Sequence, residues 1–122
     1  MPVSIWSNIV DGEYADRILA ETANTLVVKY FGQRSGAQDH LVTVGAHFFY
    51  KNGLKGKYKY VGLVTSVVKT GVENNINVYE LVIARELPER EFRIKNEACD
   101  AFGWTRLNSF AVMSGIIAHY QA

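Results

Sequence analysis

The chain of 122 residues has a formal net charge of +1, and 48% of its residues are hydrophobic and 20% charged. This length fits one domain, 1–122, which can bury a core without disulfides or a structural metal. The one cysteine, Cys99, cannot form an intramolecular disulfide, so we expect a reducing, cytoplasmic environment. We also expect no membrane partner, because the sequence shows neither a signal peptide nor about 18 consecutive apolar residues.

The N-terminal part of the chain predicts a helix followed by a strand. Asp11 can cap a helix over 11–23, because its side chain can accept hydrogen bonds from the first free backbone N–H groups. The β-branched and aromatic residues of 25–32 favour a strand, although apolar residues at i, i+4 spacing would also permit one longer helix. The polar segment 32–40 is expected to form a loop.

Three strand candidates follow, over residues 41–51, 58–69 and 76–85. Consecutive strands with short connections pair antiparallel, so the sequence predicts a meander over 41–85. The middle strand is apolar on both faces, which favours a strongly curled sheet or small barrel over a sheet with one wet face. Gly62 within this strand fits a bend or a close backbone approach.

The C-terminal part predicts two helices. Asn96 can cap the first, which is expected to end at Gly103, because glycine readily adopts the left-handed conformation found after helices. A second helix is expected from Asn108 or Ser109 to Tyr120. The predicted fold class is therefore α+β: a small curled antiparallel sheet or barrel with an N-terminal helix and two C-terminal helices.

The clearest functional signal is the mixture of lysines and aromatic residues in segment 48–60. No acidic residue lies between Asp39 and Glu73. Ammonium groups neutralise phosphates and aromatic rings stack on bases, so the leading hypothesis is a non-catalytic module that binds RNA or DNA. The alternative is a solvated hairpin whose lysines protect a sheet edge and whose aromatic residues are core. The candidate phosphate contacts are Lys51, Lys55, Lys57 and Lys59, and the candidate stacking residues are Tyr50, Tyr58 and Tyr60.

A helix-turn-helix is a second route to nucleic acid. Cys99, Gly103 and Trp104 match the small, glycine and apolar positions around its turn, and Arg106 and Asn108 would then begin a DNA-reading helix. The next residue is polar where the motif usually has an apolar one. Two helices that close a small core explain the segment equally well.

Catalytic and metal sites have no support in the sequence. His40, His47 and His119 lie apart from one another without ligands at metal-site spacing, so we expect no metal and no cofactor. Cys99 and His119 could form a nucleophile and base after folding, but a buried helical cysteine is the preferred interpretation. A small enzyme with an unrecognised site is one alternative. Another is a structural or assembly protein, such as viruses encode, that forms homo-oligomers through its sheet edges and C-terminal helix.

The stretches VGAHFFYKNG, YKYVGLVTSVV and NVYELVIAREL, within residues 44–87, resemble the central meander of EVE and related PUA-like domains. The resemblance implies a compact β-barrel with flanking helices. It also implies binding of RNA or DNA, in some members with a flipped modified base held against aromatic rings. The residues that carry the match are Gly45, Phe48, Phe49, Gly62, Val64 and Tyr79.

Overall fold

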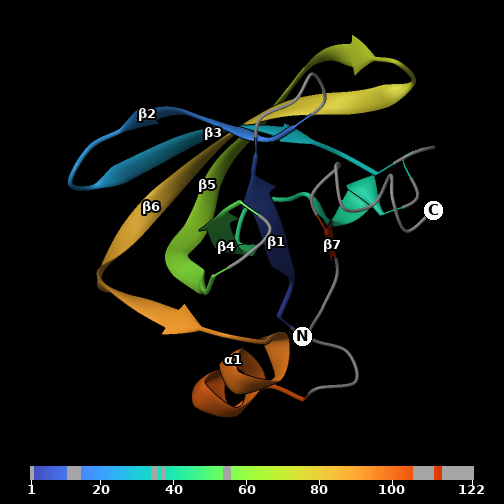
Figure 1. The fold of residues 1–122 in the computed structure, drawn as a ribbon. Coiled ribbons are helices and arrows are strands. Elements are labelled where there is room, and N and C mark those ends of the chain that lie inside the picture. The colour runs from blue at the N-terminus through green and yellow to red at the C-terminus, as the bar shows by residue number, and fades with distance from the viewer. Residues whose placement is uncertain are drawn as a thin grey trace.

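The computed structural model describes residues 2–10, 15–33, 36, 38–53, 56–105 and 112–113. Within these ranges the chain is mostly β-sheet, with a single α-helix after the long strands (Figure 1). The elements in chain order are β1 (Ser4–Ile9), β2 (Arg17–Glu21), β3 (Thr25–Phe31), the short 3-10 helix η2 (Asp39–Leu41), β4 (His47–Asn52), β5 (Tyr58–Glu73), β6 (Ile76–Phe92), α1 (Lys95–Phe102) and β7 (Val112–Met113).

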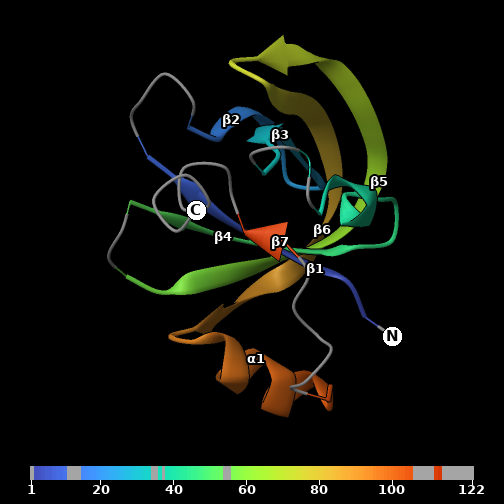
Figure 2. The same ribbon diagram turned by 90° about the vertical axis from the view of Figure 1, so that its right-hand side faces the viewer.

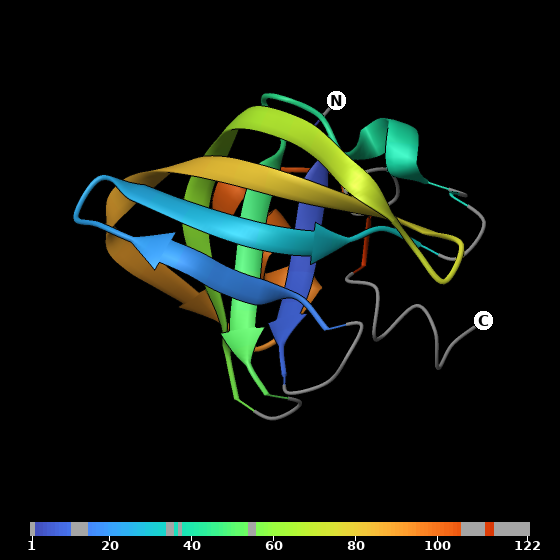
Figure 3. The same cartoon turned by 90° about the horizontal axis from the view of Figure 1, so that it is seen from above.

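The strands form one mixed sheet in the order β2-β3-β6-β5-β4-β1-β7. Neighbours from β2 to β4 are antiparallel, whereas β1 pairs in parallel with both β4 and β7. The sheet folds over itself, so that the β2–β3 hairpin crosses over β1 and β4 (Figure 3). An isolated parallel bridge between Ile9 and Asp16 then joins the end of β1 to the start of β2. We call this junction the seam, because it nearly closes the sheet into a barrel.

The two longest strands, β5 and β6, bend strongly along their length (Figure 2). Their pairing shifts register between Tyr60 and Gly62 and again between Val64 and Ser66, as expected where bulges curve a sheet. Gly62 has a φ of +151°, and a side chain there would collide with the backbone carbonyl oxygen of Ala84. The curl predicted from the apolar faces of this strand is confirmed, and Gly62 allows the close approach.

Side chains that alternate along the strands form buried clusters on both faces of the sheet. The inner core lies within the curl, and Ile5 and Phe48 belong to it. Their neighbours Trp6 and Phe49 point to the opposite face. This second group, which we call the outer cluster, lies under α1, with Phe102 and Trp104 packed against it. Its buried members are Trp6, Phe49, Tyr58, Tyr60, Phe92 and Ala98.

The prediction of an N-terminal helix over 11–23 is wrong. Arg17–Glu21 forms strand β2, which pairs antiparallel with β3, and residues 11–14 lie outside the described ranges. Leu19, expected on the apolar helix face, is 51% exposed, whereas Asp16 is buried. Pairing with a neighbouring strand therefore outweighs the local helical pattern, which is a weak determinant in so short a segment.

The prediction of two C-terminal helices is also wrong. The first is present as α1, and Gly103 follows it with a φ of 71°, as expected for a left-handed C-cap. The second predicted helix is contradicted at Val112–Met113, because these residues form strand β7 against β1. The rest of that segment lies outside the described residues. A two-residue parallel pairing has no sequence signature of its own, because residues far apart in the chain create it.

The predicted meander is confirmed, with different limits. The strands β4, β5 and β6 pair antiparallel in sequence order. However, β4 begins at His47 rather than at Leu41, because η2 and a turn precede it, and β6 continues to Phe92. The parallel pairing of β1 also makes the sheet mixed rather than antiparallel. No helix in the described part of the chain is long and apolar enough to cross a membrane.

Candidate functional site

The predicted phosphate-binding lysines lie around the hairpin that joins β4 to β5. Lys51 is half-buried at the end of β4, and its Nζ lies 4.7 Å from the ring centroid of Tyr58. Lys57 is exposed, and Lys59 is half-buried on β5. Lys55 lies outside the described residues. Lys51 therefore lies at the outer cluster. Alternation along β5 directs Lys59 to the other face of the sheet.

The three predicted stacking tyrosines are buried. Tyr50 belongs to the inner core and is 6% exposed, while Tyr58 and Tyr60 belong to the outer cluster and are 7% and 2% exposed. Burial, and then the nearby carboxylate of Glu86, raises the pKa of Tyr60 to about 12. The prediction that these rings are available to bases is therefore wrong, because both faces of the sheet are covered.

The outer cluster is a tightly packed set of rings. Trp6 and Phe49 stack with centroids 3.9 Å apart and planes 4° from parallel, and Tyr58 meets Trp6 edge-on at 4.9 Å. The indole Nε1 of Trp6 donates a 2.9 Å hydrogen bond to Ser4 Oγ. Parallel pairing of β1 with β4 sets Trp6 beside Phe49, which explains how distant segments build one aromatic surface.

We call the outer cluster together with Phe102 and Trp104 the aromatic face. Three cations lie over its rings, and we call them the basic rim: Lys51, Arg90 and Lys95. The Arg90 guanidinium carbon is 4.3 Å from the Phe102 centroid, and Lys95 Nζ is 5.6 Å from the Trp6 ring. A cation over an aromatic face is attracted by the ring quadrupole, which fixes its position. Burial lowers the pKa of Lys95 to about 8.

Phe102 and Trp104 are the half-buried members of the aromatic face. Their rings stack 4.6 Å apart with planes 14° from parallel. The left-handed turn at Gly103 reverses the chain after α1, and the backbone N–H of Trp104 donates to the carbonyl oxygen of Cys99 at 2.8 Å. This cap holds Trp104 against Phe102.

His47 lies beside both rings, with its centroid 4.7 Å from that of Trp104 and 6.0 Å from that of Phe102. Its Nδ1 is 3.0 Å from the hydroxyl oxygen of Tyr60, which also hydrogen-bonds Glu86. Half-burial lowers the pKa of His47, so its ring is neutral at neutral pH. His47 thus serves as a packing partner of the aromatic face.

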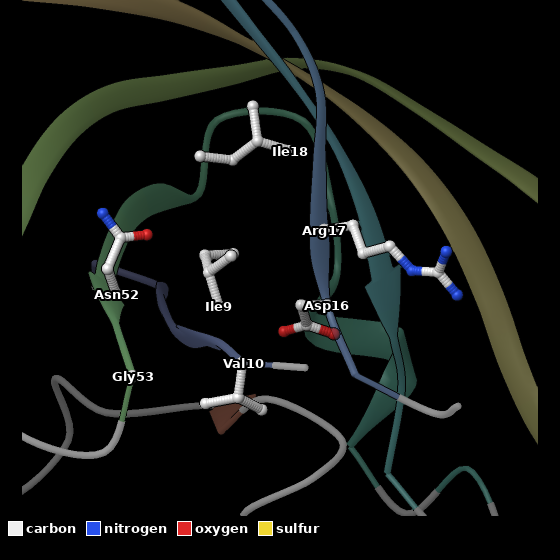
Figure 4. Close-up of a pocket in the computed structure, with 7 residues that line it drawn as sticks. All are labelled: Ile9, Val10, Asp16, Arg17, Ile18, Asn52 and Gly53. Carbon is white, nitrogen blue, oxygen red and sulfur yellow. The ribbon is translucent and has the colours of Figure 1, made fainter. Parts of the chain in front are cut away.

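A second candidate site is a pocket of about 770 Å³ at the seam (Figure 4). Figure 4 shows Ile9 and Val10 from β1 and its end, Ile18 from β2 and Asn52 from β4 around the space, with Arg17 pointing away from it. The walls therefore present both polar and apolar atoms.

Asp16 is among the residues that line this pocket, although its side chain is fully buried. Its carboxyl accepts a 2.6 Å hydrogen bond from Ser7 Oγ on β1 and a 2.8 Å bond from the Phe31 N–H on β3. Burial raises the pKa of this carboxyl from 3.8 to about 7, although both hydrogen bonds lower it. Burial, and then the Asp16 carboxylate, raise the pKa of Tyr30 well above its ordinary value. Asp16 is thus a structural link across the seam.

Asp39 makes a comparable link on the other side of the barrel. Its carboxylate accepts hydrogen bonds from the Gln33 N–H at 3.1 Å, Asn77 Nδ2 at 2.7 Å and the Tyr79 hydroxyl at 3.0 Å. A side chain at Gly32 would meet this carboxylate at 2.6 Å. These contacts link η2 and the segment before it to β6. The role of Asp39 is therefore structural.

The remaining predicted sites are not assembled. Arg106 and Asn108, the proposed DNA-reading residues, and His119 lie outside the described residues. Cys99 is buried on α1. The described residues contain no group of three or more His, Cys, Asp or Glu side chains placed to hold a metal ion.

Sequence reasoning missed Phe102 and Trp104 of the aromatic face, and Arg90 and Lys95 of the basic rim. They follow the predicted hairpin by some distance in the chain, and only the pairing of β5 with β6 brings Arg90 opposite Tyr60. The alternation of arginine and phenylalanine in REFR was the available signal.

Comparison with protein-family models, curated proteins and solved structures gives no match for this chain. The resemblance to EVE and PUA-like domains therefore stays a prediction. Any function must be argued from the geometry of the site itself.

Proposed function

We propose that the protein is a non-catalytic nucleic-acid-binding module and that its aromatic face, with the basic rim, holds the phosphate backbone. The observation that carries the proposal is the placement of Lys51, Arg90 and Lys95 over rings of a single face. The chain as a whole is nearly neutral, so a local cluster of cations is what can attract a polyanion.

The ring contacts favour phosphate binding for a physical reason. A long cationic side chain that rests on an aromatic ring has already lost part of its conformational freedom, so less entropy is lost when it binds an anion. Arg90 is the strongest candidate, because a planar guanidinium can stack on a ring and still offer its N–H fork to phosphate oxygens. Lys57 is exposed next to the hairpin, whereas Lys59 lies on the other face of the sheet and is not part of the basic rim.

One nearby acidic side chain is paired with a cation outside the basic rim. Glu97 on α1 binds Arg93 through a 2.8 Å ion pair, and its carboxylate also accepts from the Arg93 backbone N–H. Glu86 hydrogen-bonds Tyr60. Glu91 lies opposite Lys59 in the register of β5 and β6. The hydrogen bond to Tyr60 thus sets one carboxylate, Glu86, at the aromatic face beside the three cations of the basic rim.

A fluorescence-anisotropy titration with short single- and double-stranded RNA and DNA at about 50 mM salt tests the proposal. The variant K51Q/R90Q/K95Q should bind much more weakly than the wild type. The control R17Q/K29Q/K69Q removes the same number of positive charges at positions outside the aromatic face, and it should bind almost as well as the wild type. Equal losses in the two variants would contradict the assignment of the site, and no binding by the wild type would contradict the function.

Self-assembly is the second candidate function, and exposed apolar side chains favour it. Val68 and Val72 on the β5–β6 hairpin are 54% and 56% exposed, and Leu19 on the edge strand β2 is 51% exposed. Apolar side chains on a hairpin or an edge strand can pair with a second copy of the chain. Light scattering after size exclusion should then show a dimer or larger species that V68K dissociates. A monomer at high protein concentration would rule this function out.

A further inference from the structure

The aromatic face offers rings to solvent at one place. Phe102 and Trp104 are half-buried, whereas the other Phe, Tyr and Trp side chains of the described ranges are buried. A base can stack only on a ring whose face it can reach. The stacking role that the sequence suggested for Tyr50, Tyr58 and Tyr60 therefore falls to this pair.

The pair is held in place before any ligand binds. Phe102 packs edge-on against Tyr60 at 4.9 Å, and the rings of Phe102 and His47 both contact Trp104, with centroids 4.6 and 4.7 Å from it. The hydrogen bond from the Trp104 N–H to the Cys99 carbonyl oxygen fixes the backbone as well. A ring that is already ordered loses little conformational entropy on binding, which favours a stacking contact.

A cation lies next to the same rings. The Arg90 guanidinium carbon is 4.3 Å from the Phe102 centroid, and Trp104 stacks on Phe102 at 4.6 Å. A base that stacks here would contact an aromatic ring, and its phosphate would lie near the Arg90 guanidinium. Both of these protein groups are neighbours of Phe102. This combination of a stacking platform and an adjacent cation suits a nucleotide better than an isolated anion.

We infer that Trp104, backed by Phe102 and next to Arg90, forms a stacking site for an unpaired base, so that the protein binds single-stranded RNA or DNA in preference to duplex. The inference rests on the proposed nucleic-acid function. In a duplex each base stacks on its neighbours and has no free face, whereas a single strand can present one. The binding preference is therefore a property of the rings, separate from the phosphate contacts of the basic rim.

The test compares a thymidine oligonucleotide of about 12 residues with the corresponding dA·dT duplex, by anisotropy at low salt. The wild type should bind the single strand more tightly. The variant W104L should lose roughly 5- to 150-fold of that affinity, because one stacked base contributes on this scale, and should lose much less of its affinity for the duplex. The aromatic variant W104F should retain most of the single-strand affinity, which separates stacking from misfolding.

Intrinsic fluorescence gives a second readout. The chain has two tryptophans, and Trp6 is fully buried whereas Trp104 is half-buried. The single strand should quench wild-type emission but leave W104F, which retains Trp6, nearly unchanged. If the wild type binds both ligands equally and W104L keeps its affinity, the stacking site is overturned while the phosphate-binding function stands. If the wild type binds neither ligand, both proposals fail.

Discussion

Replacing Asp16 with asparagine should remove much of the pH dependence of the free energy of unfolding. Asparagine is nearly isosteric with the protonated carboxyl. Its Oδ1 can accept from the Phe31 N–H, and its Nδ2 can donate to Ser7 Oγ, so both links across the seam can persist. The variant therefore imitates the neutral state of Asp16 at every pH.

The magnitude follows from the pKa of the carboxyl in the two states. Because burial raises this pKa from 3.8 to about 7 in the fold, the folded chain holds its proton after the unfolded chain has lost it. The stabilisation is fully present below pH 3.8 and is lost as the pH rises to about 7. The loss amounts to about 4 kcal/mol, a large share of the stability of a small domain.

Urea unfolding of the wild type and D16N at several pH values between 4 and 8 measures this difference. The free energy of unfolding of D16N relative to that of the wild type should rise by about 4 kcal/mol over this range. The variant S7A should extend the wild-type dependence to higher pH, because the Ser7 hydrogen bond lowers the pKa of Asp16. A difference between D16N and wild type that stays constant with pH would refute the reasoning, since Asp16 would then titrate alike in the folded and unfolded chains.

Further predictions concern binding and the two structural constraints. Because burial lowers the pKa of Lys95 to about 8, affinity for an oligonucleotide should fall between pH 7 and 9, and K95R should abolish that fall in an anisotropy titration. A Gly62→Ala change should destabilise the fold by roughly 3 kcal/mol or more in urea unfolding, because its Cβ would collide with backbone, and a cost below about 1 kcal/mol would contradict this. An Asp39→Ala change leaves three donors without their acceptor and should cost roughly 2–4 kcal/mol, with a near-zero effect contradicting the proposed link to β6.

The sequence predicts the centre of the fold because alternation and turns are local signals. The three central strands show alternating or continuous apolar residues between polar turns, and Gly62 marks the bend correctly. The N-terminal segment could not be assigned in this way. A strand such as β2 exists because β3 offers a free edge, and the buried Asp16 reads as an ordinary polar residue until its partners Ser7 and Phe31 are in place.

The candidate site was predictable only in part. Lys51 lies on the aromatic face, but the sequence could not show whether Tyr58 and Tyr60 would be exposed, because that depends on whether another element covers the second face of the sheet. The covering element is α1, which the sequence did predict, without indicating where it packs. Arg90 and Trp104 join the site through strand register and a helix cap, and neither is a local property.

The salt dependence of single-strand binding tests the central claim most directly. Affinities of the wild type and K51Q/R90Q/K95Q for the same oligonucleotide would be measured between about 50 and 200 mM salt. If the basic rim contacts phosphates, the slope of log affinity against log salt should be steep for the wild type and shallower by about 2 in the variant, since each lost contact to a single strand removes roughly 0.7. Equal slopes for the two proteins would contradict the claim that these three cations bind the phosphate backbone.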